Sequence, residues 1–177
     1  MAAHDSSSDV PDDDAGLARA RAALEASGID FTITRHGRVR SLEEAAAARG
    51  VAPSGIVKTI VVRRGEGDHL FVLVPGGREI SWKKLRAHLG VNRMTMPDAA
   101  GALDVTGYER GTITPFGSRT ALPVIADETL QGTVSIGAGT HGAGATVDAA
   151  ALVAALGATV ADVTDPETPR GGGAAAG

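Results

Sequence analysis

A short apolar run near the middle of the chain constrains the fold more than any other segment. It reads Ile56-Val-Lys-Thr-Ile-Val-Val62. Side chains alternate between the two faces of a β-strand, so Lys58 shares a face with Ile60 and Val62, while the opposite face is nearly as apolar. A strand that is apolar on both faces belongs in the interior of a fold, covered on either side. The run therefore predicts a buried strand.

Helix and strand signals intermix along the rest of the chain. We expect helices from a cap at Asp13 or Asp14 to a stop at Gly28, over 41–50, over 81–89, from residue 97, and after Asp148. We expect strands at 29–33, 56–62, 70–74, 93–96, 122–126, 133–136, 145–147 and 159–163, with a hairpin through Gly65-Glu-Gly-Asp68. Intermixed elements that include a hairpin predict a mixed α/β sheet rather than a purely parallel one.

The length of the chain, 177 residues, suits one folded domain and is short for two. The segment 1–14 is rich in Ser and Asp, and the segment 164–177 ends in Gly-Gly-Gly-Ala-Ala-Ala-Gly. Such segments lack the apolar periodicity that a packed element needs. We therefore expect a disordered acidic leader over 1–14, a single domain over 15–163 and a flexible tail over 164–177.

The composition excludes several kinds of chemistry. The chain has no cysteine, which rules out a thiolate nucleophile, a disulfide framework, a zinc ribbon and an iron–sulfur cluster. Its five histidines lack the close spacing of metal-binding motifs, so we expect no metal site and no cofactor. We find neither a signal peptide nor an apolar stretch long enough to span a bilayer, and we expect a cytoplasmic protein without a membrane partner.

The charge distribution argues against duplex DNA as a partner. The net charge is −4, but five acidic residues lie in the first sixteen positions, which leaves 17 basic against 16 acidic residues from Leu17 onward. A balance of +1 is too weak to hold duplex DNA by charge alone, and it allows only a local basic patch. The candidates for such a patch are Lys83, Lys84, Arg86 and Arg93, although for each one a solvated helix face is the better explanation.

Two motif matches are set aside on physical grounds. Gly137-Ala-Gly-Thr-His-Gly142 fits the dinucleotide-binding pattern, but an extended segment follows it where that motif requires a helix. Ser81-Trp-Lys-Lys84 fits the pattern of serine–lysine acylases, but the companion motifs of those enzymes are missing. We expect Ser81 to be a helix cap.

Lys58 breaks the apolar pattern of its strand. Burying an ammonium group is costly unless a partner compensates its charge. One explanation is that the side chain reaches the strand end or pairs with a structural carboxylate. The explanation that we favour places the ammonium at the mouth of a cavity, where it meets a phosphate or a developing negative charge.

The segment Gly107-Tyr-Glu-Arg-Gly-Thr-Ile-Thr-Pro-Phe-Gly117 is the second unusual feature. Glycines bracket it, and Pro115 disfavours helix at the residue before it. Such a loop can direct successive backbone N–H groups towards an anion or a carbonyl oxygen, although for this segment alone an ordinary long connection is the better explanation. His141, which lies among glycines, is equally compatible with a flexible surface loop.

Together these segments resemble the YbaK / prolyl-tRNA-synthetase-associated editing domain family. The resemblance rests on the 56–62 run, Gly107-Tyr108, Gly111-x-x-x-Pro-Phe-Gly117 and Ala138-Gly-Thr-His141, in that order. It extends from Leu17 to Val163. It implies a single α/β domain with a curved, mixed, largely antiparallel β-sheet surrounded by helices, and a pocket for the aminoacyl-adenosine end of tRNA.

The resemblance also implies roles for individual residues. Lys58 matches the family lysine that contacts the tRNA 3′ end and is needed for deacylation, and Gly111 and Pro115 match the loop that positions the ester and the attacking water. These three are the predicted catalytic residues. The predicted substrate-binding residues lie in the same loop, in the glycine-rich segment and before the second helix: His36, Tyr108, Thr114, Phe116, Gly139 and His141.

The implied function is hydrolysis of mischarged aminoacyl-tRNA by a free-standing trans-editing enzyme. The ester is already activated, so a positioned water and N–H donors aimed at the developing oxyanion are enough, without a metal or a covalent nucleophile. The expected substrate carries a small amino acid such as Ala, Cys, Ser or Pro, because one methylene changes binding in a synthetase pocket by only about 1–3 kcal/mol. The expected partners are the aminoacyl-tRNA acceptor end and an aminoacyl-tRNA synthetase.

Two alternatives to this function stay open. One is a non-catalytic module on the same fold that binds a nucleotide or an aminoacyl ligand for regulation. The other is an unrelated small-molecule hydrolase that uses the same loop. Turnover of aminoacyl-tRNA separates the enzyme from the binding module, and hydrolysis of simple amino-acid esters without tRNA would favour the third interpretation.

Overall fold

The predicted hairpin forms the centre of the structure, a computed structural model that describes residues 12–168. Strand β2 (Val57–Gly65) runs antiparallel to β3 (Asp68–Pro75), with Val57 opposite Pro75 and Gly65 opposite Asp68. The turn between them is Glu66-Gly67, and Gly67 adopts a positive φ of 66°, as a tight hairpin turn requires. The hairpin prediction is confirmed.

Nine strands are distributed over three sheets within the described residues. The first has the order β2-β3-β5-β8, where β5 (Val124–Asp127) and β8 (Thr159–Ala161) run parallel to their neighbours. The second has the order β1-β7-β6, from Thr32–Arg35, Ala143–Asp148 and Thr133–Gly137, and is antiparallel throughout. The third is the antiparallel pair β4 (Arg78–Ile80) and β9 (Thr164–Pro166). The mixed, largely antiparallel α/β fold is therefore confirmed, with its strands divided among three sheets.

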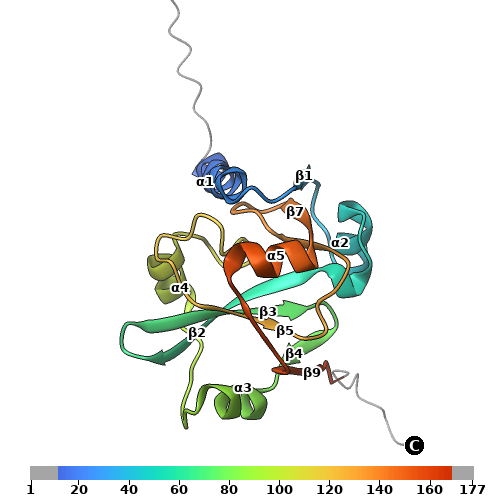
Figure 1. Cartoon of the computed structure of the whole chain (residues 1–177). Helices are drawn as coiled ribbons and strands as arrows, with labels where there is room; N and C mark the ends of the chain where they lie inside the picture. Colours follow the sequence, from blue (N-terminus) through green and yellow to red (C-terminus); the bar gives the residue numbers. More distant parts are fainter. Residues whose placement is uncertain (1–11, 169–177) are drawn as a thin grey trace, which may run out of the picture.

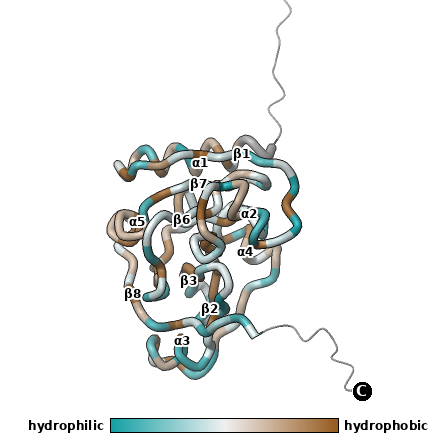
Figure 2. The backbone as a smooth tube through the Cα atoms, turned by 90° about the vertical axis from the view of Figure 1, so that its right-hand side faces the viewer, coloured by the Kyte–Doolittle hydropathy of each residue, from teal (hydrophilic) through white to brown (hydrophobic). Residues whose placement is uncertain are grey.

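Five α-helices surround these sheets within the same residues. They are α1 (Asp12–Ser27), α2 (Leu42–Arg49), α3 (Trp82–Leu89), α4 (Ala99–Thr106) and α5 (Ala149–Leu156), and a short 3-10 turn, η1, covers Pro53–Gly55. Figure 1 shows α1 with β1 and β7 at one end of the molecule and α3 with β4 and β9 at the other. Figure 2 shows the same order from the side, with β2, β3 and β6 between the two ends. None of the described helices is long and apolar enough to cross a membrane.

Local sequence signals fix where the helices start. The side chains of Ser41, Ser81, Asp98 and Asp148 each accept a hydrogen bond from a backbone N–H in the first turn of the helix that follows. In α2 the carboxylate of Glu44 reaches back to the backbone N–H of Arg40 at 2.8 Å, which completes a capping arrangement. The caps predicted at Ser41, Ser81 and Asp148 are confirmed.

The core lies on both faces of the β2-β3-β5-β8 sheet. Phe71 and Leu73 of β3 pack into one cluster together with α1, α5 and the second sheet. Leu70, Val72 and Val74 point to the opposite face, where they pack with Leu85 of α3. The central strand is therefore buried on both faces, as a nearly continuous apolar run requires.

Several predicted boundaries are wrong. The strand expected at 93–96 is reduced to a single bridge between Thr95 and Arg63, and the strand expected at 29–33 begins only at Thr32, although Ile29 is part of the core. Helix α1 begins at Asp12, inside the expected leader, while residues 1–11 of that leader and 169–177 of the expected tail lie outside the described residues.

The beginning of the expected tail is strand β9. Thr164 is fully buried, and Arg78 of β4 donates to its hydroxyl at 2.7 Å and to its carbonyl at 3.2 Å. These contacts join residues far apart in the sequence, so the local composition of the segment does not reveal them.

Candidate functional site

A cavity of about 330 Å³ lies beside the first residues of β2. Its walls come from α2, from the start of β2, from the 107–117 loop and from the end of β6: Arg49, Ile56, Val57, Lys58, Thr59, Gly111, Ile113 and Gly137. The structure thus brings Lys58 and Gly111, two of the three predicted catalytic residues, to the same cavity. The third, Pro115, lies further along the loop and is not among the residues that line it.

Two glycines bring the loop close to the sheet at this cavity. A Cβ atom on Gly137 would lie 2.5 Å from the carbonyl oxygen of Ile113, so only glycine lets the loop pass this close to β6. Gly111 has a φ of 86°, in the left-handed region that glycine favours. The approach of the loop to the cavity therefore depends on these two positions.

Lys58 is less buried than the strand pattern predicts. Its side chain is 44% exposed, and Nζ donates to the carbonyl oxygen of Arg78 at 3.0 Å and to Glu167 Oε1 at 3.2 Å. Lys58 does lie on the face of β2 that carries Ile60 and Val62, but it sits near the strand's start, beside the β4–β9 pair, where the apolar cluster ends. Features of both explanations are present, because Lys58 lines the cavity and its ammonium also pairs with the carboxylate of Glu167.

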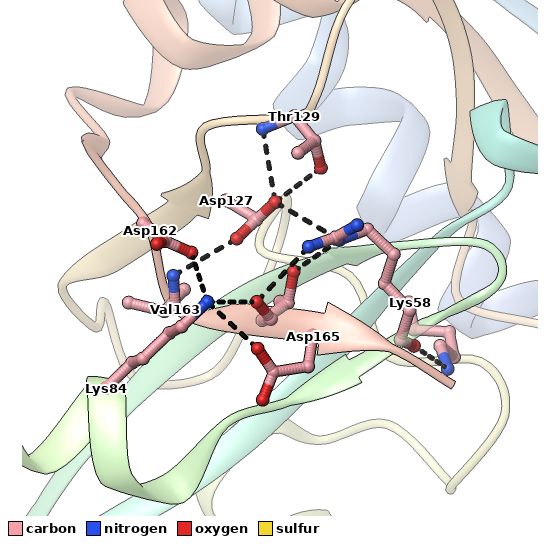
Figure 3. Close-up of polar contacts among 9 residues, drawn as sticks. Lys58, Lys84, Asp127, Thr129, Asp162, Val163 and Asp165 are labelled. Carbon is pink, nitrogen blue, oxygen red and sulfur yellow. Dashed lines mark hydrogen bonds and ion pairs between the residues drawn. The ribbon is translucent and has the colours of Figure 1, made fainter. Parts of the chain in front are cut away.

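A buried polar cluster fixes the strands beside Lys58 (Figure 3). Asp127, which is 1% exposed, accepts hydrogen bonds from the backbone N–H and hydroxyl of Thr129 and from the backbone N–H of Val163. Arg78 Nε lies 3.9 Å from the same carboxylate. Burial acts to raise the pKa of Asp127, but these hydrogen bonds outweigh it and hold the pKa below its ordinary value.

Lys84 lies beside this cluster, in a more exposed position, and ties α3 to the segment around β9. Its Nζ pairs with Asp162 at 3.0 Å and with Asp165 at 2.9 Å, and it donates to the carbonyl oxygen of Thr164 at 3.1 Å. The hydrogen bonds with Asp165 and Asp162 raise the pKa of Lys84. Among the candidates for a basic patch, Lys84 is therefore already engaged within the protein.

The 107–117 loop is closed by buried side chains. Tyr108 is 1% exposed and its hydroxyl donates to the carbonyl oxygen of Phe116 at 2.7 Å, which joins the two ends of the loop. Thr114 is fully buried and its hydroxyl accepts from the backbone N–H of Phe116, whose ring packs in the core. Of the substrate-binding residues predicted in this loop, Thr114 and Phe116 line neither the main cavity nor the second one described next.

Tyr108, Gly139 and His141, three of the other predicted substrate-binding residues, line a second cavity of about 210 Å³. Arg19 of α1 lies over the Tyr108 ring, 4.5 Å from its centre. Burial raises the pKa of Tyr108, and Arg19 partly opposes that effect. The exposed His141 ring approaches Glu109 at 3.3 Å and lies next to Gly111, whose added Cβ would be 3.5 Å from His141 Cε1. This cavity is therefore lined by other residues of the 107–117 loop, among them Tyr108 and Thr112.

Arg49, at the end of α2, also lines the main cavity, and no feature of the sequence points to it. Its Nε donates to His36 Nε2 at 3.1 Å, and burial lowers its pKa. His36 Nδ1 lies 2.7 Å from the carbonyl oxygen of Gly37, so the proton of the ring is on Nδ1 and Nε2 accepts from Arg49. His36 is thus in contact with a residue of the main cavity rather than lining it. A basic residue in the last turn of a helix is so common that no signal distinguishes Arg49.

Thr59 and the neighbouring loop carry hydrogen-bonding groups that have no partner in the part of the chain that the structure describes. The hydroxyl of Thr59 is buried and has no hydrogen-bond partner within the described residues. It lies where the main cavity meets an adjoining recess of about 200 Å³ that is also lined by Ile60, Met96 and Pro97. Within residues 12–168, the backbone N–H groups of Gly111 and Ile113 donate to no protein acceptor either. The residues that line the cavity thus include a hydroxyl and two backbone N–H groups without a protein partner in the described part of the chain.

The described residues contain no group of three or more His, Asp or Glu side chains placed to hold a metal ion. The polar groups that face the cavity are instead the side chains of Arg49, Lys58 and Thr59 and the backbone of the loop. This set contains two cationic side chains and no carboxylate. Such an arrangement suits a ligand that carries negative charge or develops it during a reaction.

Comparison with known families places most of the chain in one of them. Residues 36–164 match the family described as an aminoacyl-tRNA editing domain. The matched segment includes the main cavity and the 107–117 loop. It ends before Glu167, the residue whose carboxylate pairs with Lys58.

The curated relatives with similar sequences include proline–tRNA ligases. The ligase of Trichlorobacter lovleyi is 33% identical over 92 residues, which cover 52% of this chain and 16% of the ligase. That of Syntrophotalea carbinolica is 33% identical over 137 residues, 73% of this chain and 23% of the ligase. The chain therefore spans less than a quarter of the length of these relatives.

Two solved structures share the fold over most of the chain. A candidate trans-editing enzyme for prolyl tRNA synthetase matches with a TM-score of 0.77 and 28% identity, covering 85% of this chain and 97% of that one. A hypothetical protein of known structure matches with a TM-score of 0.75 and 27% identity, covering 83% of this chain and 99% of the other.

Proposed function

Because the chain belongs to the aminoacyl-tRNA editing domain family, we propose that it hydrolyses the ester of mischarged aminoacyl-tRNA and that it acts in trans. The similarity to proline–tRNA ligases and to 97% of a candidate trans-editing enzyme supports this proposal. The observation that carries it is the main cavity, which Lys58 lines together with Gly111 and Ile113, two residues whose backbone N–H groups have no acceptor within residues 12–168. Donors of this kind stabilise the oxyanion that forms when an ester is attacked.

The reaction needs a water molecule, an ester that is held in position, and hydrogen-bond donors that stabilise the negative charge developing on the carbonyl oxygen. Water adds to the carbonyl carbon, the bond between that carbon and the ribose oxygen breaks, and one proton of the water ends on the ribose oxygen. The products are a free amino acid and uncharged tRNA. We propose that Lys58 and the backbone N–H groups of the loop around Gly111 stabilise the negative charge that develops on the carbonyl oxygen. Pro115 would restrict the backbone conformation of that loop.

The proposed substrate carries a small amino acid: Ala, Cys, Ser or Pro. The experiment is to charge tRNA with each of the four and to follow the loss of each ester with purified protein. We expect one ester to be lost much faster than the others and faster than in buffer alone. If none of the four turns over although charged tRNA binds stoichiometrically, deacylation is wrong and a binding module takes its place. Equal hydrolysis of simple amino-acid esters without tRNA would contradict tRNA as the substrate.

Thr59 provides a test in which activity and stability respond differently. Replacing Thr59 by Val removes the unpartnered hydroxyl while keeping the shape of the side chain. A buried hydroxyl without a partner does not help the folded state, so we expect the free energy of unfolding to stay unchanged or to rise. A ligand that bonds to this hydroxyl would lose that bond, and we expect kcat/KM for deacylation to fall about tenfold, the effect of one hydrogen bond.

The matched variant is Thr59→Ser, which keeps the hydroxyl and should keep most of the activity. Denaturation and deacylation are measured on both variants. Loss of activity in the Ser variant to the same extent as in the Val variant would show that the methyl group, and not the hydroxyl, is what the cavity requires.

A further inference from the structure

Arg49 carries a charge for which residues 12–168 supply no counter-charge. Its guanidinium group contacts a neutral histidine, a hydroxyl and a carbonyl: His36 Nε2 at 3.1 Å, Ser135 Oγ at 3.5 Å and the Ala143 oxygen at 3.5 Å. Within residues 12–168 no carboxylate lies at ion-pair distance from it. A half-buried cation without an anion is unfavourable, as the lowering of the Arg49 pKa by burial indicates.

The fold nevertheless holds this side chain in a defined place. A Cβ atom on Gly144 would lie 2.8 Å from both Cδ and Nε of Arg49, so a side chain at position 144 would displace the guanidinium group. His36 fixes the orientation of Nε from the other side. The contacts of the two terminal nitrogens, at 3.5 Å, are long, so the planar pair of terminal donors remains largely available.

The chemistry of the proposed substrate limits which anion can bind the two terminal nitrogens of Arg49. The aminoacyl end of a charged tRNA carries an ammonium group and a neutral ester, and therefore no negative charge before the reaction. The nearest anion is the phosphate on the 5′ oxygen of the terminal nucleoside. A guanidinium group with two parallel N–H donors matches the geometry of a phosphate better than any other side chain.

We infer that Arg49 binds the 5′-phosphate of the terminal nucleotide, while Lys58, in the same cavity, is left to face the ester. This inference rests on the proposed deacylase function and assigns a substrate group to a residue of its cavity. The two cations then have different roles, because Arg49 positions the terminal nucleotide and Lys58 acts on the reacting carbonyl.

The test compares two small substrates that differ only in that phosphate. They are adenosine aminoacylated on its 2′(3′) oxygen and the same compound with a 5′-phosphate, each carrying the amino acid that the tRNA panel identifies. For the unmodified protein we expect the phosphate to raise kcat/KM about tenfold or more. In Arg49→Met the ratio between the two substrates should fall to about one, and in Arg49→Lys, which keeps the charge without the planar pair, it should be intermediate. A ratio in Arg49→Met equal to that of the unmodified protein would overturn the assignment.

A binding measurement keeps this inference separate from the proposed reaction. Adenosine 5′-monophosphate and adenosine are titrated calorimetrically into the unmodified protein, Arg49→Met and Arg40→Met, whose exposed arginine lies near the start of the same helix outside the cavity. Tighter binding of the monophosphate that is lost only in Arg49→Met supports the inference even if no ester is hydrolysed. Equal binding of the two compounds by the unmodified protein overturns it, whatever the hydrolysis assay shows. Thermal unfolding of each variant confirms that it is folded.

Discussion

Replacing Lys58 by Ala is expected to lower the rate of aminoacyl-tRNA deacylation by about 10²–10³-fold, the usual loss when one donor to a developing oxyanion is removed. The free energy of unfolding should change little, because the Lys58 side chain is 44% exposed and its ion pair with Glu167 is on the surface. Exposed ion pairs contribute at most about 1 kcal/mol. The two measurements are single-turnover deacylation and chemical denaturation.

Glu167→Gln is the control for this experiment. It removes the ion pair and keeps the lysine, so it separates the loss of the lysine from the loss of its partner. We expect the Gln variant to deacylate at the rate of the unmodified protein or faster. A correctly folded Lys58→Ala protein with full activity would remove Lys58 from the mechanism, and an equal loss in both variants would assign the effect to the ion pair.

The largest effect on stability is expected for Asp127→Asn. The two carboxylate oxygens accept from Thr129 on one side and from Val163 on the other. An amide provides only one acceptor oxygen, so one set of donors would face the NH₂ group, and Arg78 would lose its neighbouring charge. Removing one partner from a buried charged cluster costs about 3–5 kcal/mol, and denaturant titration at pH 7 measures it directly. Asp104→Asn is the matched control, because the carboxylate of Asp104 is 87% exposed and lies 3.8 Å from Arg119.

The same variant should change how stability depends on pH. The pKa of Asp127 is lower in the folded protein than its ordinary value, so the folded state binds fewer protons than the unfolded state in acid. Its contribution is therefore complete above the unfolded pKa of about 3.9 and is lost as the pH falls through the lower folded pKa. The difference between the unmodified protein and Asp127→Asn should shrink as the pH is lowered from 5 towards 3. A difference that stays constant over this range would mean that the carboxylate charge is not the cause.

Local signals in the sequence are sufficient to predict much of this fold. Ser41 and Ser81 are caps because a hydroxyl before a helix accepts from a backbone N–H of its first turn, and this depends on a few neighbouring residues only. The Glu66-Gly67 turn follows from glycine's access to positive φ. The two-faced burial of β3 follows from its continuous apolar run.

Features that depend on distant partners cannot be predicted in this way. Strand β9 forms because Arg78 and Lys84 hold its polar residues, and nothing within the segment itself predicts this. The exposure of the Lys58 side chain could not be predicted, because periodicity gives the face of a strand but not how far along it the covering layer extends. The role of Arg49 could not be predicted, because a basic residue in the last turn of a helix is already explained by the helix itself. The residues that position its side chain, His36 and Gly144, lie in other elements.

The bond from the Tyr108 hydroxyl to Phe116 has a consequence for selectivity. It closes the loop around Gly111 from within the core, so the loop is ordered when the chain folds and not when a substrate arrives. A loop that is ordered before the substrate binds loses little conformational entropy on binding. It also cannot change its shape to accommodate a larger amino acid. If the proposed deacylation is correct, we expect the enzyme to select amino acids by whether they fit the space that the folded loop already leaves.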